Sequence, residues 1–259
     1  MNGIVPIDKP FGLTSGQVTQ RVKNILGIEK AGHAGTLDPG TTGLLIIALG
    51  EARKAMPVLL GLPKAYEGII HLHRDVSREK IKGVFKKFKG KVEQIPPVRS
   101  AVKRRVRERE IYSLRILKIS GRDIKFEVKC QAGTYIRKLA HDIGLETGSG
   151  AHLKTLRRTG VGNFSEMVKL EKLDPKGIMP LEKALEKTGL RKIIVKNLAI
   201  QKIKSGAPVR AEWVINTDPG IKKGETIGIF SQNKKIVALG IAKEPKKGIV
   251  ARTDRVFKG

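Results

Sequence analysis

Residues 32–49 read Gly-His-Ala-Gly-Thr-Leu-Asp-Pro-Gly-Thr-Thr-Gly-Leu-Leu-Ile-Ile-Ala-Leu, a polar loop that runs directly into an apolar segment. The loop is rich in Gly, Thr and Pro, and it holds a single carboxylate, Asp38. Small residues let a backbone approach a ligand closely, and Pro39 restricts Asp38 to extended backbone angles. An Asp before a Pro is most often only a turn former. The loop by itself therefore allows two interpretations, a turn or an acid presented to a ligand.

The charge of the chain favours a nucleic-acid partner. Its 259 residues include 52 Lys and Arg against 24 Asp and Glu, for a formal net charge of +28. Such an excess favours binding to a polyanion, although basic structural proteins and peripheral membrane proteins share it. With 40% hydrophobic residues the chain can build a core, and its length predicts one or two domains.

Several other classes of protein are disfavoured. No stretch approaches 18 apolar residues, and the N-terminal segment lacks the apolar region of a signal peptide. The single cysteine, Cys130, rules out an internal disulfide framework and suggests a reducing compartment. His71 and His73 share a face of an expected strand, but two histidines without a third ligand are a weak zinc signal. We therefore expect a cytoplasmic protein with no membrane contact and no metal.

A change in the pattern of expected helices and strands along the chain indicates two domains. The helical period begins after Thr14, which makes a capping-box pattern with Gln17, and the clearest alternation of a strand runs over 123–130. The elements expected in the first part are helices at 14–26, 78–88 and after Gly133, and strands at 66–73, 114–119 and 123–130. The pattern breaks at 174–180, where Asp-Pro-Lys-Gly-Ile-Met-Pro stands.

The C-terminal part is rich in short strands. After a helix at 181–188, we expect a small helix near 197–204 and strands at 226–230, 236–242 and 249–256. The sequence therefore predicts a larger domain over 1–180 and a small β-rich domain over 190–259.

A second motif, Cys130-Gln-Ala-Gly-Thr-Tyr-Ile-Arg137, strengthens the interpretation of Asp38 as an acid with a function. In this motif a strand ends, a Gly-Thr turn follows, and Arg137 opens a helix. Arg137 could be a solvated surface charge, but if it faces Asp38 it would keep the carboxylate ionised. Tyr66, in Lys64-Ala65-Tyr66, could pack in the core or could offer the ring on which an extruded base stacks.

The basic run between residues 96 and 107 is the third feature of interest. Charge runs are usually solvated faces. This one is dominated by Arg, however, which forks to phosphate oxygens in a bidentate manner. We expect Arg104, Arg105 and Arg107 to contact RNA.

Taken in order, the motifs resemble those of the TruB-type pseudouridine synthases. They are Asp8-Lys9-Pro10, Gly32-His-Ala-Gly-Thr-Leu-Asp-Pro39, Lys64-Ala65-Tyr66, Gly133-Thr-Tyr-Ile-Arg137, and Gly150-Ala-His-Leu153 with Leu156-Arg-Arg-Thr159. The basic run is closer to the archaeal and eukaryotic branch, the dyskerin-like catalytic subunit of box H/ACA ribonucleoproteins. The C-terminal part resembles a PUA domain.

The resemblance implies an α+β fold, with a mixed, largely antiparallel sheet followed by a small β-barrel. It also implies a cofactor-free isomerase that converts a uridine within RNA to pseudouridine. On the family's pattern Asp38 is the catalytic aspartate, Tyr66 stacks against the target base, and Arg137 is the ion-pair partner of the aspartate. Further residues are expected to contact the substrate: Leu156 as a wall of the pocket, and Lys9 and His33 as residues lining the cleft.

Three functions stay open at this point. The first is the catalytic subunit of a guide-RNA particle that modifies ribosomal RNA together with H/ACA accessory proteins. The second is a stand-alone synthase that acts on the TΨC-loop uridine of transfer RNA. The third, a non-catalytic RNA-binding scaffold, is disfavoured because it would not need Asp38, Tyr66 and Arg137 together.

Overall fold

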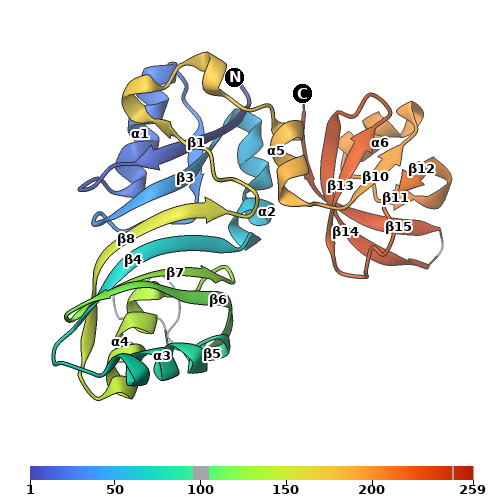
Figure 1. Ribbon diagram of the computed structural model, residues 1–259. Helices are drawn as coiled ribbons and strands as arrows, with labels where there is room; N and C mark the ends of the chain where they lie inside the picture. The colour runs from blue at the N-terminus through green and yellow to red at the C-terminus, as the bar shows by residue number, and fades with distance from the viewer. Residues whose placement is uncertain (96–104, 247, 259) are drawn as a thin grey trace.

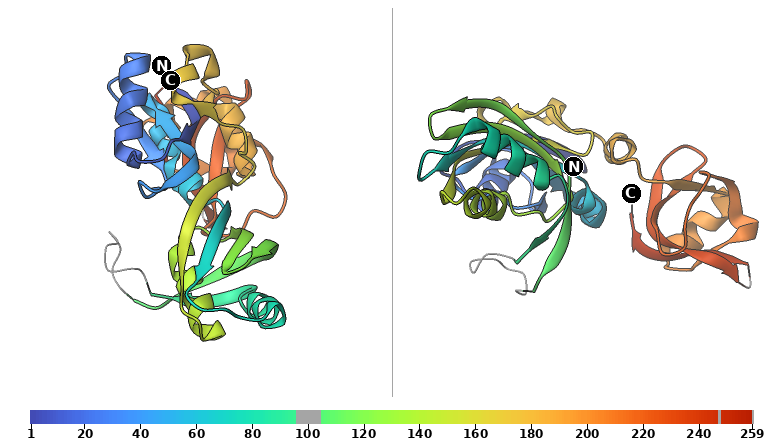
Figure 2. Two further views of the ribbon diagram at one scale, coloured as in Figure 1. Left: turned by 60° about the vertical axis from the view of Figure 1, so that its left-hand side comes forward. Right: turned by 60° about the horizontal axis from the view of Figure 1, so that its bottom comes forward.

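The computed structural model describes residues 1–95, 105–246 and 248–258, and it shows two domains with the helix α5 (Leu181–Thr188) between them (Figure 1). Within these residues, nine strands form the sheet of the larger domain and six form that of the smaller one. The two ends of the chain lie near each other beside α5 in all views (Figures 1 and 2).

The sheet of the larger domain is mixed and mainly antiparallel, as the sequence predicts. Its strands follow the order β5-β6-β7-β4-β8-β3-β1-β9, and β2 pairs with β3 beside this path. The parallel pairs are β3 with β8 and β1 with β9. The strands are β1 (Gly3–Lys9), β2 (Ala31–Ala34), β3 (Thr41–Leu49), β4 (Lys64–Leu72), β5 (Gly90–Gln94), β6 (Arg107–Ser120), β7 (Asp123–Cys130), β8 (Ala151–Val161) and β9 (Val168–Lys169).

The apolar end of the opening stretch forms β3, the most deeply buried strand of this sheet. Residues 43–49 pair with β1 along one edge. Along the other edge, residues 41–43 pair with β8 and residues 46–49 pair with β2. The loop that joins β2 to β3 therefore leaves the sheet where β8 and β2 diverge.

Both faces of β3 are covered, which explains its unbroken apolar sequence. Leu45 and Ile47 belong to a core cluster with Val18 and Val22 of α1 (Ser15–Leu26). Leu44, Ile46 and Ala48 belong to a different cluster, which includes Leu59 of α2 (Met56–Gly61) and Leu185 of α5. At the far end of the sheet, α3 (Arg78–Lys87) and α4 (Ile136–Thr147) cover a third cluster around Phe126. The helix α1 starts at the capping box of Thr14 and Gln17 that the sequence predicts.

The smaller domain is a curled six-stranded sheet in the order β11-β15-β14-β13-β10-β12. Its elements are β10 (Lys192–Val195), α6 (Ile200–Lys204), β11 (Val209–Arg210), β12 (Val214–Thr217), β13 (Thr226–Ser231), β14 (Ile236–Lys246) and β15 (Ile249–Val256). It has its own core cluster, which includes Ile193, Trp213 and Ile229. The predicted α+β class with a small β-rich second domain is confirmed.

The two domains share buried apolar contacts through α5. Phe230, Leu239 and Phe257 of the smaller domain lie in the same core cluster as Leu181 and Leu185 of α5. The ends of the chain meet the larger domain at one residue: the Glu51 main-chain N–H donates to Asn2 Oδ1 (2.8 Å), and the Lys258 N–H donates to Glu51 Oε2 (3.2 Å).

None of the helices in the described part of the chain has the length and apolarity needed to span a membrane.

The junction of β3 and β8 generates a prediction about stability. Gly43 has a φ of +96°, and a Cβ added there would lie 2.2 Å from the main-chain oxygen of Arg158. We expect Gly43→Ala to lower the free energy of unfolding, measured by urea denaturation, by more than about 1 kcal/mol. Gly83→Ala is the matched control, because Gly83 lies in α3 with open space around its Cα. That variant should be neutral or stabilising by up to about 1 kcal/mol, and equal effects at the two positions would contradict the close approach of β3 and β8.

Candidate active site

The loop between β2 and β3 forms one wall of a cavity of about 650 Å³. Its other walls come from β4, β8 and the segment that joins β7 to α4. Four residues singled out in the sequence line this cavity: Asp38, Tyr66, Arg137 and Leu156. The structure thus brings together side chains that are separated by up to about half the chain.

The loop that carries Asp38 is held from behind by the start of α1. Ser15 Oγ accepts a hydrogen bond from the Leu37 N–H (2.8 Å) and lies 3.1 Å from the Leu37 carbonyl oxygen, to which it donates. The Gly12 N–H donates to the Pro39 carbonyl (2.9 Å), and the Thr41 N–H donates to the Asp38 carbonyl (2.9 Å), which closes a turn. Every one of these bonds uses backbone groups of the loop, so the position of Asp38 is set independently of its own carboxylate.

Lys9 also holds this loop, and it does not line the cavity as the resemblance implies. Its side chain is fully buried at the end of β1. The ammonium donates to the carbonyl oxygens of Pro10 (2.9 Å), Leu13 (2.6 Å) and Pro39 (3.2 Å). Burial lowers the pKa of Lys9, and the negative charge of Asp38 partly opposes this shift. Because its three N–H groups donate to main-chain carbonyls, Lys9 fixes the position of the loop that carries Asp38 from the buried side of that loop.

Arg137 faces Asp38 across the cavity. Its Nε lies 3.1 Å from Asp38 Oδ2, and about half of each side chain is exposed, 52% for Arg137 and 51% for Asp38. The start of α4, which carries Arg137, is anchored by the buried side chain of Gln94. The Gln94 Nε2–H donates to the Tyr135 carbonyl (3.1 Å), and its Oε1 accepts from the Tyr135 N–H (2.9 Å). The ion pair is therefore open to water, whereas the backbone that presents it is fixed by buried contacts.

Tyr66 and Leu156 form the apolar side of the cavity. They lie on the paired strands β4 and β8, where Tyr66 is opposite Arg158 and Leu156 is opposite Gly68. Burial raises the pKa of the Tyr66 phenol, so the ring stays neutral at physiological pH. A neutral aromatic ring beside an aliphatic side chain is a suitable surface for a planar, uncharged base.

Two buried cations complete the cavity, and the sequence analysis assigned no role to either. Arg158 is 1% exposed, and its Nε and Nη2 donate to the carbonyls of Leu44 (2.7 Å) and Gly35 (3.0 Å). Lys64 is 6% exposed, and its Nζ donates to the carbonyls of Leu60 (2.6 Å) and Leu62 (2.7 Å). Sequence did contain a signal for Arg158, because it stands two residues after the pocket residue Leu156 and so shares its face of β8.

The remaining candidate residues lie outside the cavity lining or outside the described chain. His33 lies on β2, and burial together with the charge of Arg158 lowers the pKa of its imidazole. Arg105 is exposed ahead of β6, and Arg107 is the first residue of that strand. Arg104 falls outside the described residues.

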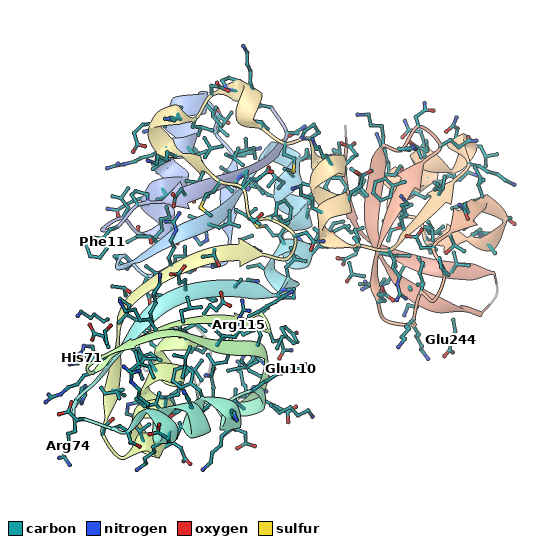
Figure 3. The ribbon with its side chains drawn as sticks, viewed as in Figure 1. Phe11, His71, Arg74, Glu110, Arg115 and Glu244 are labelled. Atoms are coloured by element: carbon teal, nitrogen blue, oxygen red, sulfur yellow. The ribbon has the colours of Figure 1, made fainter. Side chains whose placement is uncertain are left out.

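No group of three or more His, Cys, Asp or Glu side chains is placed to hold a metal ion within residues 1–95, 105–246 and 248–258. His71 and His73 have different hydrogen-bond partners, although both of their rings lie beside that of His152, with centroids 5.3 Å and 5.2 Å away. His71 Nδ1 is 2.6 Å from Asp123 Oδ1, and His73 Nε2 is 3.0 Å from His152 Nδ1. His71 lies at the outer edge of the larger domain, whereas the exposed Phe11 points into solvent beside the loop of Asp38 (Figure 3).

A second cavity, of about 840 Å³, lies on the smaller domain beside Trp213. The ammonium of Lys202 lies 5.5 Å from the centre of the Trp213 ring system, and the guanidinium of Arg210 lies 5.8 Å from it. Both cations line the cavity together with the turn of Ser205 and Gly206. Glu212 also lines this cavity, with its Oε1 4.0 Å from Arg210 Nη1, so two cations face one carboxylate. A concave surface with a net positive charge and an aromatic ring is suited to a phosphate backbone.

The first cavity combines a carboxylate with a surface for an uncharged ring. Asp38 offers a carboxylate that is ion-paired with Arg137. Tyr66 and Leu156 offer a surface for stacking, and Lys64 and Arg158 provide positive charge at the buried end. This combination fits nucleophilic or acid–base chemistry by a carboxylate.

Comparisons with known proteins agree with this geometry. Residues 23–136 match the family description "TruB family pseudouridylate synthase (N terminal domain)". Residues 137–195 match "tRNA pseudouridylate synthase B C-terminal domain", and residues 191–256 match "PUA domain". The chain is 44% identical to the probable tRNA pseudouridine synthase B of Methanopyrus kandleri, with 99% of this chain and 82% of that protein covered. It is 42% identical to the protein of the same name from Pyrococcus abyssi, covering 98% and 83%.

Solved structures give the same result for the fold of the whole chain. A chain in the crystal structure of a Cbf5-Nop10-Gar1 complex superposes with a TM-score of 0.90 at 40% identity, covering 98% of this chain and 84% of that one. A chain in the structure of an H/ACA RNP bound to a substrate RNA containing 2'-deoxyuridine superposes with a TM-score of 0.88 at 36% identity, covering 99% and 85%.

The contrast between Arg137 and Lys9 leads to a second prediction about stability. The exposed pair of Arg137 and Asp38 should contribute little, so Arg137→Ala should change the free energy of unfolding by less than about 1 kcal/mol. Lys9→Met keeps the aliphatic stem but leaves buried carbonyls without a charged donor, and it should cost roughly 1.5–3 kcal/mol. Chemical denaturation of both variants measures the difference. A larger loss for Arg137→Ala than for Lys9→Met would contradict the assignment of Lys9 as the residue that holds the loop.

Proposed function

The chain belongs to the TruB family of pseudouridine synthases, which isomerise uridine within RNA, and from this premise we propose that it is the catalytic subunit of a guide-directed H/ACA ribonucleoprotein acting on ribosomal RNA. The observation that carries the proposal is the agreement of both domains, at a TM-score of 0.90, with a chain solved in a Cbf5-Nop10-Gar1 complex. We expect accessory proteins of that kind, together with guide RNA, to be partners of this chain.

In the proposed reaction, different side chains of the cavity bind the base and react with the sugar. A uridine extruded from its RNA strand enters the cavity and stacks on Tyr66, with Leu156 as the opposite wall. Asp38 meets the sugar carbon from which the base departs, and Arg137 holds the carboxylate in an ion pair. The glycosidic bond breaks, the uracil ring turns, and its C5 joins the sugar carbon. No electrons are gained or lost overall, so the chemistry needs no redox cofactor.

Binding of RNA extends beyond this cavity in the proposal. Arg105 and Arg107, and Arg104 in the sequence between β5 and β6, supply phosphate contacts near the larger domain. The second cavity, with Trp213, Lys202 and Arg210, receives a single-stranded RNA end: the ACA of a guide or the CCA of a transfer RNA. Holding one end of the RNA raises the effective concentration of the rest at the catalytic domain.

A stand-alone synthase for transfer RNA is the second candidate, and the names of the sequence relatives favour it. The proteins of Methanopyrus kandleri and Pyrococcus abyssi are both described as probable tRNA pseudouridine synthase B. The core motifs are shared by the two candidate functions, so the choice between them depends on which RNA is modified and whether a guide is required.

The catalytic assignment is tested by Asp38→Asn. This variant keeps the size of the side chain but removes its charge, so pseudouridine formation should be abolished while the affinity for RNA changes little. Tritium release from RNA that contains 5-tritiated uridine measures turnover, and a filter-binding titration measures affinity. Asp218→Asn is the matched control, because Asp218 lies in the smaller domain and its Oδ2 accepts only from the Lys192 N–H (2.9 Å), which an amide oxygen can replace. Turnover of Asp38→Asn within about tenfold of the parent would overturn the assignment.

Guide dependence is tested with two substrates in parallel. A ribosomal RNA fragment is incubated with the chain and accessory proteins, with a matching guide, a mismatched guide or no guide, and a transfer RNA transcript is incubated with the chain alone. We expect modification of the ribosomal target only with the matching guide, weaker assembly when the ACA of the guide is deleted, and some residual activity on transfer RNA.

The opposite result is equally informative. Efficient guide-free turnover of transfer RNA, together with no measurable binding of guide RNA, would reject the guide-directed function and establish the stand-alone synthase instead.

A further inference from the structure

Lys64 and Arg158 are two cations buried at the closed end of the cavity, and neither has a carboxylate partner in the part of the chain that the structure describes. They are 6% and 1% exposed. Their hydrogen bonds run to main-chain carbonyls, those of Leu60 and Leu62 for Lys64 and those of Leu44 and Gly35 for Arg158. Within the described residues, no acidic side chain is among the groups that act electrostatically on the two cations; these groups are Arg158 and Cys130 for Lys64, and the Tyr66 hydroxyl for Arg158.

The two side chains converge on one point of the cavity. A Cβ placed on Gly35 would lie 3.5 Å from Arg158 Nη1 and 4.0 Å from Lys64 Cε, so both side chains lie under the same residue of the loop. Lys64, Tyr66 and Arg158 all line the cavity. Because Tyr66 and Arg158 are directly opposite each other on β4 and β8, the guanidinium lies next to the surface on which a base would stack.

The hydrogen bonds of the two cations hold the loop and strands in place, but the stability of the fold does not require that these donors carry uncompensated charge. An unpaired buried charge costs several kcal/mol, and replacement by well-packed apolar side chains is often neutral or stabilising. Carbonyl dipoles satisfy hydrogen bonds of the two cations but do not neutralise them. The positive potential at this end of the cavity therefore remains available to a group that carries negative charge there, and it acts strongly because the surroundings are of low polarity.

The isomerisation of uridine creates such a charge. When the bond between N1 and the sugar carbon breaks, its electron pair stays with the uracil ring, which then carries one negative charge shared by N1 and the two carbonyl oxygens. The ring turns, C5 forms the new bond to the sugar carbon, C5 loses its proton, and N1 gains one. The product is therefore neutral, and the ring is anionic only while it is detached.

We propose that Lys64 and Arg158 stabilise the detached uracil anion, and that they do so at the buried end of the cavity while Asp38 meets the electron-poor sugar carbon at the open end. The half-exposed ion pair of Asp38 and Arg137 and the buried pair of cations then act on opposite partners of the breaking bond. The inference rests on this cavity being the uridine site, which the Asp38→Asn experiment tests separately.

The test compares Lys64→Met, which removes the charge, with Lys64→Arg, which keeps it. Steady-state kcat and KM are measured on the RNA substrate between pH 6 and 10. In the proposal, the charge of Lys64 acts only when negative charge develops on the uracil ring. Lys64→Met should therefore lower kcat roughly 10²–10³-fold and leave KM nearly unchanged. Lys64→Arg should recover most of the lost kcat.

The pH profile supplies a readout that a purely structural role would not give. Burial, and next the charge of Arg158, lower the pKa of Lys64 to about 8. The groups that face it are Arg158 on β8, Cys130 on β7 and Tyr66 on β4, and the pKa of the Cys130 thiol is itself raised to about 11 by burial. Lys64 is charged below this pKa and neutral above it, so kcat of the parent should fall as the pH rises through about 8. In Lys64→Arg that fall should move to higher pH.

The experiment includes a control variant and defines the results that would overturn the inference. Lys54→Met removes another partly buried lysine that donates to a carbonyl, that of Val256 (2.7 Å), at the contact between the domains, and its kcat should equal that of the parent. Thermal unfolding is recorded for each variant; if Lys64→Met does not fold, the profiles of the parent and of Lys64→Arg still decide. Equal kcat for Met and Arg at position 64, or an unchanged profile in Lys64→Arg, would overturn the inference. If either of these results were found while Asp38→Asn was inactive in the same assay, the role of the two cations would be rejected and the assignment of the cavity as the uridine site would stand.

Discussion

The architecture of the site depends on the hydrogen bonds that the buried guanidinium of Arg158 donates to main-chain carbonyls. Arg158 lies on β8 and donates to the carbonyl of Leu44 on β3 and to the carbonyl of Gly35 in the loop that carries Asp38, and it is opposite Tyr66 of β4 in the sheet. A buried guanidinium that lost these partners would destabilise the fold, so the strands and the loop are held in one relative position. Gly43 makes this possible, because only a residue without a side chain lets β3 approach the backbone of Arg158 so closely.

Charge is distributed along the depth of the cavity. Asp38 and Arg137 meet at the open end, where water screens them and their pairing contributes little to stability. The elements that present them are fixed by other, buried contacts: Lys9 and Ser15 behind the loop, and Gln94 at the start of α4. Asp38 and Arg137 are thus placed by a scaffold that does not depend on their own charges. A variant can therefore lose catalysis and keep the fold.

The two domains are coupled by packing. Phe230 and Phe257 share a core cluster with α5 and with β3 of the larger domain, and both ends of the chain, through Asn2 and Lys258, are hydrogen-bonded to Glu51 at that contact. An RNA end bound beside Trp213 would consequently lie at a defined distance from the uridine cavity. A fixed distance between the two cavities suits an RNA whose own fold, or whose guide, sets the distance between its bound end and the target uridine.

The local sequence determined the elements whose signals lie within a few residues: the capping box before α1, the alternation in β7, and the turn that precedes α4. The motifs pointed to Asp38, Tyr66 and Arg137, and the family resemblance added Leu156; the structure gathers all four around one cavity. Only the tertiary structure decided that Lys9 lies beneath the loop, that β3 pairs in parallel with β8, and that Lys64 and Arg158 are buried cations. The physical reason is that burial depends on how distant segments pack, and the partners of a charge can lie far along the chain, as Leu44 and Gly35 do for Arg158. No pattern within one segment records which distant carbonyl or ring will lie beside it.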